Sequence, residues 1–162
     1  MNRCSWCNLK NQKYVDYHDN EWCVLNMDER YLYEMFILES FQAGLSWECV
    51  LNKREAFLKA YDNFDIDKVV KYDDVKIEEL RNNKDIIRNR LKIQASINNS
   101  KIYMNIVNEF GSFYNYLSHF SGGRIFYEIG KTTSALSDKI SFDLRCRGMK
   151  FVGSTIIYSY LC

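Results

Sequence analysis

Glu39 is a carboxylate at a position where a charged side chain is not expected. In a helix predicted over residues 28–43, apolar side chains recur every three to four residues, and Glu39 falls on their face. An ionised carboxylate taken out of water needs a partner or a changed protonation state, and buried acids of this kind are often functional. The alternative is a structural acid satisfied by helix N–H groups or by an arginine, and the spacing leaves both interpretations open.

Aromatic side chains are dense in the first third of the chain, around this carboxylate. They are Trp6, Tyr14, Tyr17, Trp22 and Trp47. Aromatic planes together with one buried carboxylate could sandwich a flat, electron-poor ring and bind its edge through hydrogen bonds. Ordinary core packing explains the same residues equally well when they are considered alone.

Metal ligands are sparse, because the chain has only two histidines. Cys4, Cys7 and His18 are candidate zinc ligands near the N-terminus. Structural zinc uses four ligands, so the second half of such a site has to come from elsewhere. His119 and Cys162 are candidates on composition alone, and neither has a paired ligand beside it.

Length and composition bound the class of protein. The 162 residues are 47% apolar and 15% aromatic, which predicts one domain with a real core and excludes a disordered chain. No apolar run approaches the roughly eighteen residues of a membrane span, and the N-terminus lacks the apolar run of a secretory signal. We therefore expect the six cysteines to be reduced and the protein to be cytoplasmic.

The charge is balanced overall but uneven along the chain. The formal net charge of +1 excludes a supercharged surface or a polyanion-binding tail. Residues 84–101 carry five basic side chains against one acid, and residues 139–150 carry four against one. These segments are either ordinary solvated helix faces or a basic side that faces phosphates.

Capping residues and glycines predict a mainly helical chain without linkers or repeats. Asp28 and Ser46 are expected to begin helices, and the second helix carries an apolar face as far as Tyr61. Further helices are predicted from Asp65, from Asp73, up to Gly111, over 112–120 and over 137–147, with a turn at 82–85. Segment 151–158 is ambiguous, because its β-branched and aromatic residues favour a strand while a buried helix is equally allowed.

Several short blocks of residues in this sequence match, in the same order along the chain, blocks that are typical of a known family. They are Cys4-Ser5-Trp6, Tyr14-x2-Tyr17-His18-Asp19-x-Glu21-Trp22, Leu38-Glu39-x2-Gln42-Ala43-Gly44-Leu45-Ser46-Trp47, Lys53-Arg54-Glu55, Ile86-Ile87-Arg88-Asn89-Arg90, Lys92-Ile93 and Arg147-Gly148-x-Lys150-Phe151-Val152-Gly153. With these blocks the sequence resembles bacterial DNA-3-methyladenine glycosylase I, a member of the helix-hairpin-helix DNA glycosylase superfamily. The resemblance covers nearly the whole chain.

The resemblance implies an all-α fold with a helix at 151–161. It implies a single glycosylase domain over 1–162, in which the terminal segments 1–25 and 137–162 pack together and a hairpin lies near 82–93. The implied activity is excision of 3-methyladenine from alkylated double-stranded DNA, which leaves an abasic site. We expect a monomer that needs no cofactor for this chemistry and no membrane.

Site residues are carried over by matching position. Glu39 and Tyr17 are implied to hydrogen-bond the extruded base, Trp47 and Trp6 to stack on it, and Tyr14 and Trp22 to line the pocket. Gly44 and Leu45 match the residues that plug the gap left in the duplex. The hairpin is implied to hold phosphate through backbone N–H groups, with the following residues as DNA contacts: Ile86, Ile87, Arg88, Arg90 and Lys92.

The chemistry agrees with these residue types. A base inside the stack has to be flipped out before an enzyme can reach it. Methylation at N3 makes adenine cationic and weakens its glycosidic bond, so a carboxylate and aromatic faces favour it over ordinary adenine. No second acid in the blocks serves clearly as a water-activating base, so Glu39 is expected to act in recognition and electrostatic stabilisation.

The sequence departs from the family in its zinc site. Cys4 and His18 match half of a zinc clasp that joins the two ends of the family fold, but a later His and Cys have no counterpart, so the C-terminal end resembles a truncated one. Zinc is then either not bound, or Cys7, Cys162 or a partner completes the site. Cys23 replaces a glycine, and the hairpin lacks glycine, which leaves Asn83 or Asn89 for any left-handed residue.

Two other functions remain open beside excision of 3-methyladenine. One is a truncated, non-catalytic protein that binds lesions or abasic DNA, and the other is a helical small-ligand pocket unrelated to DNA.

Overall fold

The computed structural model describes residues 3–162 and is helical throughout, with no strand in that range. This confirms the all-α prediction. The elements are α1 (Gln12–Asn20), α2 (Glu29–Gln42), α3 (Trp47–Leu51), α4 (Arg54–Ala60), the 3-10 helix η1 (Asp62–Phe64), α5 (Ile66–Val69), α6 (Asp74–Asn82), α7 (Arg90–Phe110), α8 (Phe113–Ser121), α9 (Ala135–Cys146) and α10 (Ser154–Leu161). None of the helices in this range is long and apolar enough to cross a membrane.

Side-chain caps begin the helices where the sequence predicts them. The Asp28 carboxylate accepts the N–H of Tyr31 at 2.8 Å at the start of α2. Ser46 and Asp73 act in the same way at the starts of α3 and α6. Each cap satisfies an N–H group that has no partner within its helix, so these starts follow from local sequence alone.

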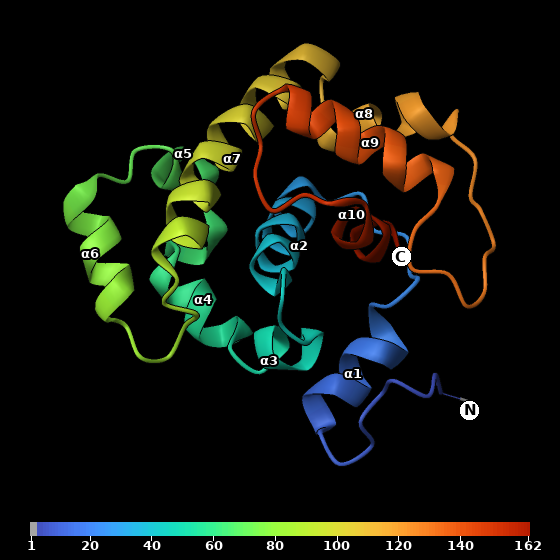
Figure 1. The fold of residues 1–162 in the computed structure, drawn as a ribbon, viewed down its shortest axis with the longest axis horizontal. Helices are drawn as coiled ribbons and strands as arrows, with labels where there is room; N and C mark the ends of the chain where they lie inside the picture. Colours follow the sequence, from blue (N-terminus) through green and yellow to red (C-terminus); the bar gives the residue numbers. More distant parts are fainter. Residues whose placement is uncertain (1–2) are drawn as a thin grey trace.

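Helix α2 runs through the centre of the molecule (Figure 1). It packs against α3, α7, α8 and α10, and every residue from Leu32 to Phe41 is buried. The predicted one-sided apolar stripe is therefore too narrow a description, because neighbours cover this helix on several sides. Glu39 lies in the last turn and a half of α2, inside this buried stretch.

Two predicted elements differ from the structure in detail. The single helix expected from Ser46 to Tyr61 is divided into α3 and α4, with a break at Asn52 and Lys53. The ambiguous segment at 151–158 forms α10, which begins after Gly153 and packs against α2 and α9. Burial of Ile157 in this packing outweighs the local preference of β-branched residues for a strand.

Helices α6 and α7 and the loop 83–89 between them make the hairpin unit. The Ile86 side chain is buried and anchors the loop, while Arg88 is exposed. Asn83 and Asn89 have φ of −77° and −81°, so neither takes the left-handed conformation considered for them. Asn89 instead caps α7 by accepting the N–H of Lys92 at 3.1 Å.

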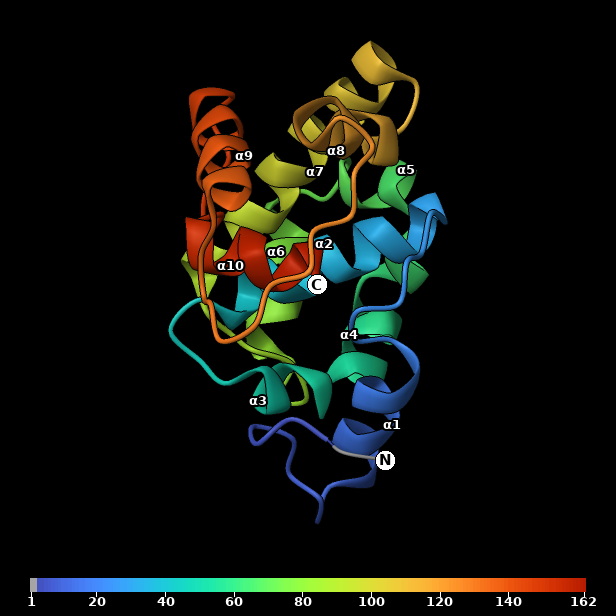
Figure 2. The ribbon, with the colours of Figure 1, turned by 90° about the vertical axis from the view of Figure 1, so that its right-hand side faces the viewer.

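Chain segments from the two ends meet beside α2. The N–H of Cys23 donates to the carbonyl of Cys162 at 2.5 Å, and the Tyr160 hydroxyl donates to the carbonyl of Leu32 at 3.0 Å. Figure 2 shows α1 and α3 at one end of the molecule, with α9 and α10 along one side. Residues 1 and 2 of the predicted terminal segment 1–25 lie outside the described residues.

Candidate active site

The Glu39 carboxyl group is almost completely buried and only half satisfied. Its side chain is 1% exposed, and Oε1 accepts a hydrogen bond from the Ser159 hydroxyl of α10 at 3.0 Å. Oε2 is buried without a hydrogen-bond partner. Burial raises the pKa of Glu39 from its ordinary value of 4.5 to about 8, although the Ser159 donor opposes this change. Within residues 3–162 no arginine pairs with Glu39, which removes one of the two structural explanations for this acid.

The five predicted aromatic residues form one continuous cluster. The ring of Trp6 lies 5.3 Å from Tyr14 and 5.1 Å from Trp22. The ring of Tyr17 lies 6.3 Å from Trp22 and 5.3 Å from Trp47. These distances are typical of favourable aromatic contacts, so the cluster is held together before any ligand arrives.

The carboxyl group and the aromatic cluster belong to the same site. Burial raises the pKa of the Tyr17 hydroxyl, and the nearby charge of Glu39 raises it further. Trp47 is the first residue of α3, which follows α2 after a four-residue turn, and it packs on Tyr17. Three parts of the chain thus meet here: α1, the C-terminal half of α2 and the start of α3.

Three buried polar atoms in this region have no hydrogen-bond partner among residues 3–162. They are Oε2 of Glu39, Oε1 of Gln42 and Nε1 of Trp47. Glu39 and Gln42 lie three positions apart on α2, so they share a helix face. Buried polar groups are nearly always paired in folded proteins, and unpaired ones concentrated in one place indicate a ligand-binding function.

Sequence reasoning missed two residues of this site. Gln42 stands inside the block from Leu38 to Trp47, and its spacing from Glu39 is the signal that could have singled it out. Ser159 gave no such signal, because it lies in the segment whose secondary structure was ambiguous. Only the packing of α10 against α2 brings its hydroxyl to Glu39.

The turn between α2 and α3 presents an apolar residue to solvent. Gly44 has φ of +76°, a conformation that favours glycine, and a Cβ atom there would meet nothing within 4 Å. Leu45, at the tip of the turn, is 41% exposed. Leu45 is therefore open to contact with a neighbouring molecule.

The basic residues near the hairpin fall into two groups. Arg88 and Arg90 are exposed, so their guanidinium groups are open to solvent. Lys92 is buried, and its ammonium group donates to the carbonyl groups of Phe41, at 2.7 Å, and of Ala43. The DNA contact predicted for Lys92 therefore does not fit its side chain, because the ammonium group is already bonded inside the protein.

The predicted zinc ligands do not form a complete site. The Nε2 atom of His18 accepts the N–H of Cys4 at 3.1 Å, and Nδ1 lies 3.0 Å from the Asp19 carboxylate. Residues 3–162 contain no group of three or more His, Cys, Asp or Glu side chains arranged to hold a metal ion. Zinc thus does not fit the residues described, and no step of the chemistry below involves it.

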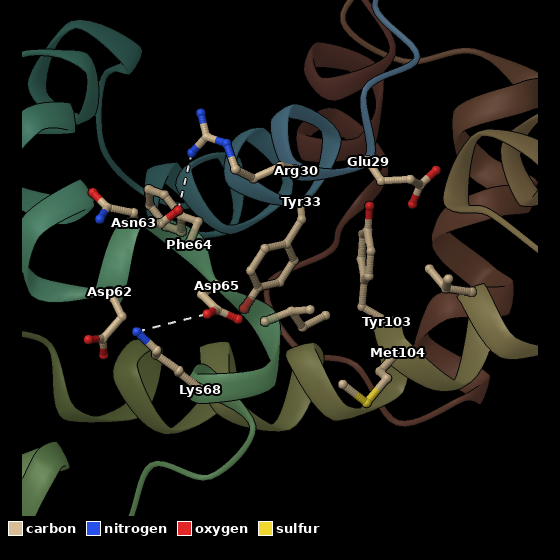
Figure 3. Close-up of a pocket in the computed structure, with 12 residues that line it drawn as sticks. Glu29, Arg30, Tyr33, Asp62, Asn63, Phe64, Asp65, Lys68, Tyr103 and Met104 are labelled. Carbon is tan, nitrogen blue, oxygen red and sulfur yellow. Dashed lines mark hydrogen bonds and ion pairs between the residues drawn. The ribbon is translucent and has the colours of Figure 1, made fainter.

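Two cavities lie away from the carboxyl group. The larger, about 550 Å³, is bordered by the N-terminal half of α2, η1, α5 and α7, and includes Tyr33, Phe64 and Tyr103 (Figure 3). The smaller, about 240 Å³, borders the N-terminal segment at Cys4 and Cys7. Neither includes Glu39.

A buried carboxyl group walled by aromatic rings, beside a helix-hairpin-helix unit, defines a helical DNA glycosylase fold. The chain belongs to the methyladenine glycosylase family, whose family model matches residues 6–162. It is 41% identical to DNA-3-methyladenine glycosylase 1 of Escherichia coli (strain K12), over 99% of this chain and 89% of that protein.

Solved structures agree with this assignment. A crystal structure of 3-methyladenine DNA glycosylase I superimposes with a TM-score of 0.92 at 38% identity, over 98% of this chain and 90% of that one. A tyrosine-to-phenylalanine variant of 3-methyladenine DNA glycosylase I, solved in complex with 3-methyladenine, gives a TM-score of 0.91 at 31% identity. That match covers 99% of this chain and 89% of the variant.

Proposed function

We propose that this protein is a monofunctional DNA glycosylase that hydrolyses the N-glycosidic bond of 3-methyladenine in alkylated DNA and leaves an abasic site. Membership of the methyladenine glycosylase family supports this function. The observation that carries it is the set of unpaired buried atoms of Glu39, Gln42 and Trp47 beside the aromatic cluster. A flat cationic base with hydrogen-bond donors on its edge supplies what the two oxygens lack, and its face can stack on the Trp47 ring.

Recognition of the base is divided between its edge and its faces. The Glu39 and Gln42 oxygens accept hydrogen bonds from the base edge, and Tyr17 adds a further polar contact. Trp6 and Trp47 stack on the ring, while Tyr14 and Trp22 line the pocket. When the base enters, its contacts with the aromatic faces replace contacts between the rings.

The substrate contributes much of the reactivity. Methylation at N3 places positive charge on the base, so the C1′–N9 bond breaks with the base leaving as neutral 3-methyladenine. Water adds to C1′ and loses a proton, which completes the hydrolysis. Burial in a low-dielectric site strengthens the attraction between an ionised Glu39 and the charged base, and this favours the methylated base over adenine.

Extrusion of the base needs contacts with the duplex as well. Gly44 and Leu45 fill the space that the flipped base leaves, which offsets part of the few kcal/mol that unstacking costs. The hairpin from Ile86 to Arg90 holds phosphate through its backbone N–H groups, with Arg88 and Arg90 adding charge. Neutralisation of phosphates makes this binding weaken steeply with salt.

The working form is a cytoplasmic monomer acting on double-stranded DNA, with no cofactor in the chemical step. The single domain spans 1–162, its terminal segments 1–25 and 137–162 packed together and its hairpin near 82–93. One contact between them supports the packing of the terminal segments, namely the hydrogen bond from the N–H of Cys23 to the carbonyl of Cys162. Sedimentation of the protein with and without duplex DNA tests whether the protein is a monomer.

The decisive experiment measures release of free 3-methyladenine from methylated duplex DNA by the purified chain. Glu39→Gln is assayed beside it, with Glu55→Gln as a control, since Glu55 is exposed and pairs only with Lys13. We expect release by the wild type and by Glu55→Gln, and a loss of about a hundredfold or more in Glu39→Gln. A folded wild-type protein that binds methylated duplex without releasing base would instead support the non-catalytic, lesion-binding alternative.

A further inference from the structure

The buried ammonium group of Lys92 connects two parts of the molecule that are far apart in sequence. Its side chain leaves the first turn of α7 and donates to the carbonyl groups of Phe41, at 2.7 Å, and Ala43. Lys92 is only 8% exposed, and lysine is rarely buried unless it is paired. These two carbonyls belong to the C-terminal end of α2, where carbonyl groups lack partners within the helix and attract positive charge.

The carbonyls bonded to Lys92 come just before the exposed turn between α2 and α3. Gly44 follows Ala43 directly and has φ of +76°, and the N–H of Leu45 bonds back to the Gln42 carbonyl at 2.6 Å. The direction in which Leu45 leaves the protein surface is therefore set by the backbone at residues 41–44. This is the segment that the Lys92 ammonium group holds.

The other end of the Lys92 residue belongs to the hairpin. Its N–H donates to the Asn89 side chain at 3.1 Å, which fixes the loop 83–89 at the start of α7. A second lysine bonds the same loop to the break between α3 and α4, since Nζ of Lys53 donates to the carbonyl of Asp85 at 3.1 Å. The loop that is to hold phosphate and the turn that is to enter the duplex thus share a bonded path through one side chain.

We propose that Lys92 is a positioning residue that fixes the Leu45 turn relative to the hairpin, so that gripping the DNA backbone places Leu45 for insertion beside the extruded base. This inference deepens the proposed glycosylase function and rests on it. Lys92 touches neither the base nor the phosphates in this arrangement. Its action is on the geometry with which the protein enters the duplex.

The chemistry of the position suits lysine. A compact ammonium group on a flexible stem can reach two neighbouring carbonyl oxygens, whereas the planar guanidinium group of arginine is larger and has a fixed donor geometry. The ring of Phe151 lies 5.8 Å from Nζ and covers the charge on another side. A neutral apolar side chain would leave the Phe41 and Ala43 carbonyls without their donor.

The test compares Lys92→Met with Lys101→Met, the same change at an exposed position on α7. Three quantities are measured: single-turnover release of 3-methyladenine from duplex DNA, affinity for undamaged duplex, and affinity for free 3-methyladenine. We expect Lys92→Met to release base about tenfold more slowly or worse, because small misplacements of a positioned group cost rate steeply. Both affinities are expected to stay within about twofold of the wild type, because the phosphate and base contacts remain.

A third variant tests whether a loss of stability alone would slow base release. Ile106→Val removes one methylene from a fully buried residue of the same helix without touching the turn, and it is expected to release base at the wild-type rate. If Lys92→Met does not fold, Lys92→Gln is assayed in its place. Its amide nitrogen is one bond closer to the backbone than Nζ and cannot reach both carbonyls as lysine does, so this variant is also expected to release base more slowly than the wild type.

Two results overturn the inference while leaving the enzyme assignment intact. One is a wild-type release rate in the Lys92 variant that is assayed. The other is a parallel loss of affinity for the free base, which would locate the effect in the pocket. If the wild-type protein releases no base, the proposed function itself is contradicted. The wild-type assay therefore distinguishes failure of the proposed function from failure of the Lys92 inference.

Discussion

The hydroxyl of Ser159 donates a hydrogen bond to Oε1 of Glu39 at 3.0 Å, although the two residues lie 120 positions apart in the chain. Ser159 is the one hydrogen-bond partner of this carboxyl group within residues 3–162, and it leaves Oε2 unpaired. The last helix of the described chain thereby orients the acid that is proposed to read the base. It also favours the ionised form of that acid, against the effect of burial.

The first prediction concerns the pH dependence of excision. If ionised Glu39 binds the cationic base, kcat/KM for base release should rise with pH and level off above the pKa of about 8 in the free protein. Ser159→Ala removes a donor to the carboxylate, so it should move the midpoint to higher pH. Thr155→Ala, an exposed change on the same helix, should leave the midpoint in place. A pH profile that is identical in the wild type and Glu39→Gln would exclude ionised Glu39 as the titrating group.

The second prediction concerns stability. Because the pKa of Glu39 is raised in the folded state, its contribution is fully present below pH 4.5 and is lost as pH rises toward 8. Over that interval the free energy of unfolding should fall by about 1.4 kcal/mol per pH unit from this group alone. Glu39→Gln lacks this dependence and should be more stable than the wild type at pH 8. Urea unfolding at pH 5 and pH 8 measures both, and an equal pH slope in the two proteins would contradict the raised pKa.

Local sequence was enough to predict the helix starts, but not the clustering of the aromatic residues. The Asp28 and Ser46 caps act within three residues of their own position, so no tertiary information is needed for them. The aromatic cluster followed from the resemblance, which assigned Trp6 and Trp47 to one pocket. In the structure their rings are linked through Trp22 and Tyr17.

Long-range contacts account for what the sequence did not reveal. The resemblance implied a DNA contact for Lys92, but its partners are carbonyl groups at the end of a helix about fifty positions earlier. Ser159 belongs to a segment whose β-branched neighbours obscured even its secondary structure. In both cases the role is set by which helices pack together, and helix packing is not encoded in any one segment.

The third prediction concerns a buried ionic network behind the aromatic cluster. Arg54 donates to Glu34 at 2.6 Å and to Glu21 at 2.8 Å, and Glu34 is 1% exposed. Arg54→Met would leave the buried Glu34 with only a distant contact to Arg30, at 3.6 Å. We expect a loss of about 3–5 kcal/mol in the free energy of unfolding. Arg81→Met breaks an exposed pair with Glu78 and should cost less than about 1 kcal/mol. Equal costs in the two variants would show that the Arg54 network is not essential.

The fourth prediction concerns backbone strain at Cys23. This residue has φ of +57°, a left-handed conformation that costs a residue with a Cβ atom about 1–2 kcal/mol. Cys23→Gly should therefore stabilise the fold, by somewhat less than this because glycine also loses more entropy on folding. Cys23→Ala removes the thiol but keeps the strain, so it isolates the backbone effect. A higher melting temperature for Cys23→Ala than for Cys23→Gly would be inconsistent with strain at this position.

The fifth prediction separates insertion into the duplex from recognition of the base. Leu45 is 41% exposed in the turn between α2 and α3. Its apolar side chain is proposed to fill the space that the flipped base leaves in the duplex. Leu45→Ala removes most of this side chain at little cost to the fold, because the residue is not part of the buried core. Excision from duplex DNA should slow by about tenfold, since the unstacking cost is no longer offset, while the affinity for free 3-methyladenine should not change. Leu25→Ala, an exposed leucine of the loop between α1 and α2, is the control and should behave as the wild type. Equal excision rates for Leu45→Ala and Leu25→Ala would show that the turn does not enter the duplex, and would leave base extrusion to the hairpin and the pocket.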